Sequence, residues 1–424
     1  MRFPYIRLTN KVRQVKILRL LHFKIAILLM AIAVIDNCNE ASPGRTGENL
    51  KDAAGHSEGE SKLDYGADDT SRRIVKDAQS YDDDGRLRPT DDCVHPEVVE
   101  ECRGGWCRIP SGCFVFGSRD AEGHLCRSKF GETQVQVTLT RDFEILSTEL
   151  TQSQWQEAGL DLPNPLNRAP CPNCPVSWIT VYEAMAYCNA LSQHKGLPEC
   201  YDLSSCTGTI GGGCPDERPY FCDGNQTDVY ICTENTQIYS ADPHDCPGYR
   251  LPTTVEWEYA ARAGTRTATY AGDFADNIEE SCDPHPVVDK VAWHCGNAMG
   301  DPNSIDELDR ISIPVARKQP NGFGLFDMIG GAGEFCASTR KNKALEALVG
   351  EKGPLVDPAP PLEIFNEHMN IVIRGGGYTL APCYCRSAYG YPGARAPVRW
   401  FSWGFRPVRT LDVNWKPDAT PRWR

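Results

Sequence analysis

The chain has 424 residues, with 44 lysines and arginines against 57 aspartates and glutamates, so its net charge is −13. This acidity argues against nucleic acid as a partner, because phosphate backbones are bound through cationic surfaces. The length suits two average domains or one loop-rich domain with a disordered arm, and 37 glycines and 31 prolines predict much irregular structure.

The first residues have the pattern of a signal peptide, which we assign to residues 1–37. An apolar run from Ile25 to Ile35 is too short to cross a bilayer, and it follows six basic residues: Arg7, Lys11, Arg13, Lys16, Arg19 and Lys24. Cleavage could follow the small residues at 31–33. Alternatively, residues 34–38 loosely resemble a bacterial lipobox, in which case Cys38 would carry a lipid. We expect membrane association only through this signal or a lipid anchor.

Residues 38–92 are rich in Gly, Ser, Asp, Glu and Lys and poor in large apolar side chains. Such a segment cannot bury enough surface to offset the entropy of ordering, so we predict a disordered tether. The acidic runs Asp82–Asp84 and Asp91–Asp92 could be drawn as a calcium site, but acidic runs in linkers are usually just solvated.

Twenty cysteines indicate an oxidising compartment, and therefore a periplasmic, cell-surface or secreted protein. The close pairs Cys102/Cys107 and Cys171/Cys174 could suggest zinc. The sequence has no histidine cluster or second Cys-x-x-Cys at a suitable distance, so disulfides are the favoured interpretation.

The folded domain is predicted to span residues 93–412, followed by a tail at 413–424. Residues 106–117 predict a strand and a turn, and residues 134–139 alternate as in a strand. Three helices are predicted from capping boxes, formed by Thr151 with Gln154, Thr180 with Glu183, and Thr253 with Glu256. A glycine stops each helix: Gly159, Gly196 and Gly264.

Residues 197–249, between the second and third helices, carry six cysteines, the run Gly211-Gly212-Gly213 and little apolar pattern. This pattern predicts a surface insertion that is cross-linked by disulfides. Further strands are predicted at 291–298 and 311–315.

Residues 330–334 form a glycine-rich stretch that ends on the carboxylate of Glu334. Exposed backbone carbonyls together with a carboxylate would suit the hard cation Ca²⁺. The candidate ligands are Gly331, Gly333, Glu334, Asn297 and Asp309. The alternative is that Glu334 pairs with an arginine, for example Arg374 or Arg406.

The densest motif lies at residues 372–388, where a β-branched run enters three glycines and then two thiols, Cys383 and Cys385. Other motifs accompany it: Ile109-Pro110-x-Gly112-x-Phe114-x-x-Gly117, Glu149 to Gln156, Pro175 to Trp178, Arg250 to Arg262, Asn321 to Met328, Arg374-Gly375-Gly376 and Gly404-Phe405-Arg406. In this order, over roughly residues 105 to 410, they resemble the formylglycine-generating enzyme (sulfatase-modifying factor) family.

This resemblance implies an α+β domain, loop-rich and disulfide-rich, related to the C-type-lectin-like fold. Catalytic members of the family oxidise a sulfatase cysteine to formylglycine with O₂ and Cu(I). Two cysteines five positions apart, after the Arg-Gly-Gly turn, hold the copper, and soft Cu(I) prefers such thiolates.

The chain departs from that pattern. Aligned on the turn, the second family cysteine falls on Cys385, but the first falls on Leu380, which cannot ligate copper. Gly377 stands where the catalytic type usually has a serine. We therefore do not expect a Cu(I) site, and the alternative is a rearranged site built from Cys383 and Cys385.

The sequence thus predicts an exported, divergent family member that acts as a binding or scaffolding module for an unidentified protein, peptide or glycan. Tyr378, Trp400 and Trp403 could line its binding cleft above the glycine turn, although aromatic residues there often serve packing. Two alternatives remain: a formylglycine-generating oxidase with a rearranged site, and a structural cell-envelope lipoprotein anchored at Cys38.

Overall fold

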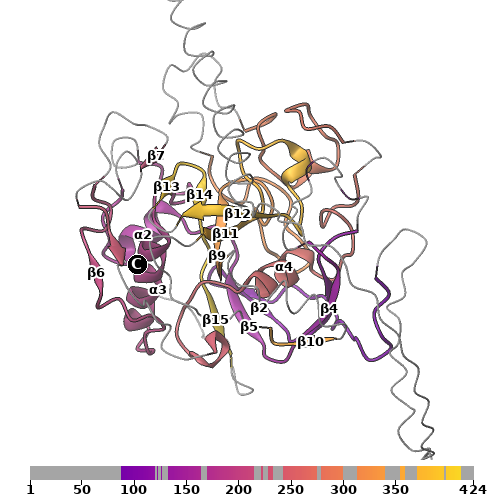
Figure 1. Ribbon diagram of the computed structural model, residues 1–424, viewed down its shortest axis with the longest axis horizontal. Coiled ribbons are helices and arrows are strands. Elements are labelled where there is room, and N and C mark those ends of the chain that lie inside the picture. The colour runs from indigo at the N-terminus through magenta and orange to yellow at the C-terminus, as the bar shows by residue number, and fades with distance from the viewer. Residues whose placement is uncertain are drawn as a thin grey trace, which may run out of the picture. The chain divides into compact units, whose positions relative to one another are not determined.

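The computed structural model (Figure 1) describes residues 87–119, 122, 126, 132–163, 170–213, 221–222, 228–232, 242–274, 278–298, 313–339, 354–358, 370–395 and 398–411. All of them lie in one compact unit, residues 76–424. The predicted signal peptide, Cys38, most of the predicted tether, Asp309 and the predicted tail fall outside the described residues. Within the described ranges, no helix is both long and apolar enough to cross a membrane.

The described helices are α2 (Gln152–Glu157), α3 (Val181–His194) and α4 (Thr254–Arg262), with 3₁₀ turns η2 (Pro243–Asp245), η3 (Val288–Lys290) and η4 (Pro382–Tyr384). One sheet has the order β1 (Cys102–Arg103), β2 (Trp106–Ile109), β5 (Phe143–Leu146), β15 (Val408–Thr410). A second has the order β10 (Leu355–Val356), β4 (Val135–Leu139), β3 (Gly112–Phe116). A third has the order β12 (Gly390–Arg395), β11 (Asn370–Arg374), β9 (Gly333–Thr339), β14 (Trp403–Gly404). Two further pairs are β6 (Cys206–Thr207) with β8 (Ile231–Cys232), and β7 (Phe221–Cys222) with β13 (Arg399–Trp400).

Strand β9 stands between two hydrophobic clusters, because side chains along a strand alternate between its faces. Phe335 and Ala337 belong to the cluster built around α3, whereas Cys336 belongs to the cluster that contains residues of α4. In Figure 1, α3 and α4 accordingly lie on opposite sides of the β9–β11 pair. Packing on both faces of the sheet therefore fixes two glycine-rich turns, one before β9 at residues 330–333 and one after β11 at residues 375–377.

All three predicted helices are confirmed. Each begins with a complete capping box, in which the threonine hydroxyl accepts from the third residue's backbone and that residue's side chain accepts from the threonine amide. The predicted stops Gly159, Gly196 and Gly264 all have positive φ, which glycine adopts at little cost.

Three local predictions are wrong. Residues 87–92 are not part of a disordered tether, because Leu87 is buried and its amide donates to Gln134 Oε1 at 2.7 Å. The amide of Thr90 donates likewise to Gln136 Oε1 at 2.8 Å. Amino-acid composition does not predict that the side chains of Gln134 and Gln136 will accept hydrogen bonds from the backbone of this segment.

Residues 291–298, predicted as a strand, form turns instead. The amide of Ala298 donates to the carbonyl of His294 at 2.8 Å, and Asn297 Oδ1 accepts from the amide of His294 at 2.9 Å. Local bonds of this kind compete with strand pairing. Residues 313–315, the described part of the other predicted strand, are also outside any strand.

Seven disulfides are present among the described residues: 93–113, 102–107, 126–383, 171–174, 200–246, 206–232 and 282–295. The pairs Cys102/Cys107 and Cys171/Cys174 are therefore disulfides rather than zinc ligands. Two of the seven, 200–246 and 206–232, lie inside the predicted cysteine-rich insertion.

A buried ion pair joins the C-terminal part of the domain to β9. Arg406 Nη2 lies 2.7 Å from Glu334 Oε1, and Arg406 Nε lies 2.8 Å from Oε2. The guanidinium also donates to three carbonyls, those of Leu146, Phe326 and Asp327. Buried charges need this degree of compensation, since desolvation is otherwise too costly. The interpretation of Glu334 as an arginine partner is confirmed for Arg406.

Two more carboxyls lie beside this pair. Glu149 is buried, and its Oε1 accepts from the amide of Ala332 at 2.5 Å. Asp327 Oδ2 accepts from the amide of Ala316 at 2.6 Å. Burial raises the pKa of Glu149 well above its usual value, and the charges of Asp327 and Glu334 raise it further.

We predict that Arg406→Met lowers the free energy of unfolding by about 3–5 kcal/mol, because it leaves the Glu334 carboxylate buried without its cation. Urea unfolding followed by tryptophan fluorescence measures this. Arg103→Met, at an exposed position, is the control and should change stability by less than about 0.5 kcal/mol. A loss for Arg406→Met as small as the control's would contradict the assigned role.

We also predict a pH effect from Glu149. A carboxyl whose pKa is higher in the folded chain than in the unfolded chain stabilises the fold at low pH, and this contribution disappears as the pH rises through the folded-state pKa. Wild-type stability should therefore fall more steeply than that of Glu149→Gln as the pH is raised from about 4 to about 8. Urea unfolding across this range tests it, with the exposed Glu157→Gln as control. Parallel curves for wild type and Glu149→Gln would refute the prediction.

Candidate functional site

Two glycine turns face each other at the centre of the domain. The amide of Gly330 donates to the carbonyl of Gly375 at 2.7 Å, and the amide of Tyr378 donates to the carbonyl of Gly331 at 2.8 Å. Gly375 has a φ of 91°, and a Cβ there would lie only 3.0 Å from the carbonyl oxygen of Met328. The close approach of the two turns therefore requires glycine.

Charged residues fix both ends of the Arg374–Arg386 segment. Arg374 pairs with Glu258 on α4 and donates to the carbonyl of Ala388 at 2.8 Å. Arg386 Nη1 lies 2.7 Å from Glu132 Oε2, and both of these side chains are buried. The segment that would carry the family's copper site is thus held rigidly.

The thiols of this segment do not form a copper site. Cys383 is bonded to Cys126, so the suggestion that it substitutes as a copper ligand is wrong. Cys385 is a free but fully buried thiol, and burial raises its pKa to about 12, so it is protonated near neutrality. Leu380 offers no donor atom. The residues present therefore do not fit the family's Cu(I) site, which needs two thiolates.

Four of the five predicted calcium ligands lie in the described residues, and each of the four already takes part in hydrogen bonds within the protein. Both carboxylate oxygens of Glu334 already accept hydrogen bonds, from Arg406 and from Trp257 Nε1. The carbonyl of Gly331 accepts from Tyr378, and Asn297 Oδ1 accepts from the amide of His294. Gly333 contributes its amide to the carbonyl of Ser402. In the part of the chain that the structure describes, no group of three or more His, Cys, Asp or Glu side chains is placed to hold a metal ion.

The predicted aromatic cleft is only partly formed. Trp400 and Trp403 lie together, with ring centroids 5.9 Å apart, and both are half-buried. Tyr391 is a third member that the prediction missed, at 6.0 Å from Trp403. Tyr378 does not belong to this group, because it is buried in a separate cluster with Ala298 and Ala332. The aromatic residues therefore form a partly exposed patch, and Tyr378 does not line it.

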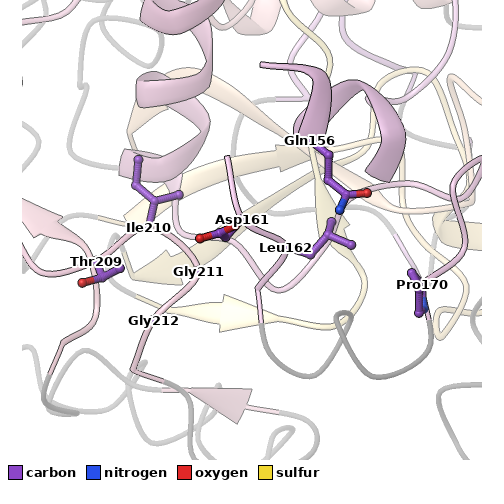
Figure 2. Close-up of a pocket in the computed structure, with 8 residues that line it drawn as sticks. All are labelled: Gln156, Asp161, Leu162, Pro170, Thr209, Ile210, Gly211 and Gly212. Carbon is purple, nitrogen blue, oxygen red and sulfur yellow. The ribbon is translucent and has the colours of Figure 1, made fainter. Parts of the chain in front are cut away.

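A cavity of about 420 Å³ lies elsewhere, between the loop after α2 and the cysteine-rich insertion (Figure 2). Its lining residues are Gln156, Asp161, Leu162, Pro170, Thr209, Ile210, Gly211 and Gly212. Figure 2 shows Asp161 and Leu162 between the Thr209–Gly212 loop on one side and Pro170 on the other. The cavity thus combines apolar walls with an amide, a carboxylate and a hydroxyl.

A buried ion pair holds one wall of this cavity in place. Glu183 on α3 lies beside Arg399, and neither side chain is accessible to solvent. Glu183 Oε1 accepts from the amide of Gly211 at 2.6 Å, while its Oε2 accepts from the amide of Thr180 in the capping box. Arg399 also donates to the carbonyl of Gly212. One carboxylate therefore caps a helix, binds an arginine and positions the insertion loop.

Sequence reasoning found Glu183 as a capping residue and noted the glycines at 211–213, but it did not bring them together. The link is the pairing of Glu183 with Arg399, which is 216 positions away. A buried arginine such as Arg399 has no local sequence pattern that reveals its partner. The only sequence signal was the glycine run inside an insertion, where a loop that approaches another element closely needs small residues.

The chain is similar in sequence to several known proteins. The chain is 31% identical over 221 residues to chaperone protein LppX of Paenibacillus barcinonensis, covering 50% of this chain and 68% of that protein. It is 25% identical over 287 residues to the formylglycine-generating enzyme of Streptomyces coelicolor, covering 66% of this chain and 81% of that enzyme.

Solved structures of similar proteins include Treponema denticola variable protein 1, at 23% identity and a TM-score of 0.48, covering 72% of this chain and 95% of that one. PvdO from Pseudomonas aeruginosa matches at 19% identity and a TM-score of 0.45, covering 72% of this chain and 94% of that one. The family model for the sulfatase-modifying factor enzyme 1-like domain matches residues 95–411, which confirms the predicted family and its disulfide-rich α+β fold. The chain belongs to the sulfatase-modifying factor enzyme 1-like family.

Proposed function

We propose that this chain is an exported binding module that uses the family scaffold without its copper chemistry, and that its ligand is a segment of another polypeptide. The observation that carries the proposal is the state of the copper positions. Leu380 replaces one ligand, Cys383 is held in a disulfide, and Cys385 is a buried, protonated thiol.

The cavity beside α2 is the binding site that the geometry favours. Its volume of about 420 Å³ lies within the range of small ligand pockets, and it could accept one or two side chains of a peptide. Leu162, Ile210 and Pro170 would contact apolar groups, while Gln156 and Asp161 could bind peptide amides. Asp161 is exposed, so a segment that carries a cation would be preferred.

A polypeptide ligand is also favoured by the relative whose name is chaperone protein LppX, since chaperones bind other polypeptides. Export is favoured by the predicted signal peptide and by seven disulfides among the described residues. A calcium ion and a glycan ligand, both expected from the sequence, have no further support from the described side chains.

The two alternatives give different outcomes. A formylglycine-generating oxidase with a rearranged site would convert the cysteine of a Cys-x-Pro-x-Arg peptide to an aldehyde after loading with Cu(I). A structural envelope lipoprotein would stay with the membrane fraction, lose that association in Cys38→Ser, and bind no polypeptide.

We predict that the chain binds an unfolded polypeptide and that Gln156→Arg weakens this binding at least about tenfold, because the longer cation fills the cavity mouth and meets a cationic ligand segment. Fluorescence anisotropy with a labelled, unstructured peptide rich in lysine and leucine measures it. Gln193→Arg is the matched control, since Gln193 is an exposed glutamine near the end of α3 that does not line the cavity, and it should leave affinity unchanged. No binding by wild type, or equal loss in both variants, would contradict the proposal.

A further inference from the structure

The turn Cys171-Pro172-Asn173-Cys174 is closed by a disulfide across three positions, the shortest separation among the seven described. A disulfide stabilises a fold mainly by restricting the unfolded chain, and this effect grows with loop length. The bond at 171–174 therefore contributes least of the seven to stability by this mechanism. Its position needs another explanation.

The turn is held in place without its disulfide. The amide of Gln152 donates to the carbonyl of Cys174 at 2.9 Å, and the amide of Ser153 donates to the carbonyl of Pro172 at 3.0 Å. The amide of Cys171 donates to Gln152 Oε1 at 2.9 Å. From another loop, the amide of Val315 donates to the carbonyl of Asn173 at 2.9 Å. Reduction of the disulfide would thus leave the backbone of the turn in its place.

The two sulfurs are not equally accessible. Pro172 and Asn173 are exposed, and Cys171 is half-buried, whereas Cys174 is only 1% exposed. Thiol–disulfide exchange requires an attacking thiolate to approach one sulfur in line with the bond to the other. Cys171 is therefore the sulfur that an external thiolate can reach, and Cys174 is the leaving thiolate.

The turn also adjoins the cavity proposed above for a polypeptide. Pro170, directly before Cys171, lines that cavity, and so does Gln156 from α2, the helix whose first two amides bind the turn (Figure 2). A peptide segment held there would have its neighbouring residues close to Cys171. This placement rests on the proposed function, whereas exchange with a small thiol does not.

We infer that Cys171 and Cys174 form a redox-active pair that exchanges with thiols of a bound polypeptide. A substrate thiolate attacks Cys171 Sγ, the bond between the two cysteines breaks, and Cys174 leaves as a thiolate and takes up a proton. A second substrate thiolate then attacks the substrate sulfur of the mixed disulfide and releases Cys171. Two electrons pass from the substrate dithiol to the chain's disulfide, and a substrate disulfide forms. The reverse reaction with a disulfide such as oxidised glutathione restores the pair.

Redox titration of the folded, full-length chain tests this. The protein is equilibrated in glutathione buffers of graded potential, free thiols are alkylated, and the peptides are quantified by mass spectrometry. We expect the peptide carrying 171 and 174 to be reduced at a ratio of reduced to oxidised glutathione at least about tenfold below that needed for any other described disulfide. Reduction of this pair only together with the others would overturn the inference.

Single variants provide a second, asymmetric test. In Cys174→Ser, the half-buried Cys171 thiol should form a mixed disulfide with oxidised glutathione at least about tenfold faster than Cys174 does in Cys171→Ser, since Cys174 is buried. Equal rates would contradict the assignment of Cys171 as the attacked sulfur. The double variant Cys171→Ser/Cys174→Ser should still bind the labelled peptide rich in lysine and leucine. The two proposals can therefore fail separately, since exchange with glutathione can be absent while peptide binding is present, and peptide binding can be absent while exchange is present.

Discussion

The buried pair of Arg406 and Glu334 is the interaction on which the centre of this domain depends. It joins strand β9 to the segment that leads into β15. Arg406 also binds the end of β5 through the carbonyl of Leu146, and the loop before the first glycine turn through the carbonyls of Phe326 and Asp327. Because both charges are fully buried, neither can be lost alone without leaving an uncompensated ion. The same pairing engages both oxygens of the carboxylate that the sequence suggested as a calcium ligand.

The scaffold of the family's active centre and the chemistry of that centre are separable in this chain. The Arg374–Gly375–Gly376 turn is kept, and it is anchored by Glu258 and packed against the turn at 330–333. The sulfur atoms around it serve other purposes: Cys383 closes a loop of 257 positions with Cys126, and Cys385 packs in the core. The cavity and the Cys171–Cys174 turn lie on other elements, around α2 and the insertion.

Much of this architecture could be predicted from the sequence because its causes are local. The three capping boxes, the glycine stops and the strand at 135–139 depend on residues within one turn or on simple alternation. The long-range features could not be predicted. Nothing near Cys383 indicates Cys126, and nothing near Glu183 indicates Arg399. Tyr378 follows the glycine turn toward the core rather than the surface, since its backbone pairs with Gly331 and turns its ring toward Ala298 and Ala332. The hydrophobic periodicity of a sequence does not predict such side-chain orientations, because tertiary packing determines them.

The central claim is that the family scaffold persists here without a copper centre, and Cu(I) affinity tests it most directly. Wild type and Cys385→Ser are titrated with Cu(I) under anaerobic conditions against a chromogenic Cu(I) chelator, and the copper retained per folded chain is measured. The account predicts that neither protein competes with the chelator, so the two titrations coincide. Retention of one Cu(I) per chain by wild type, and its loss in Cys385→Ser, would contradict it.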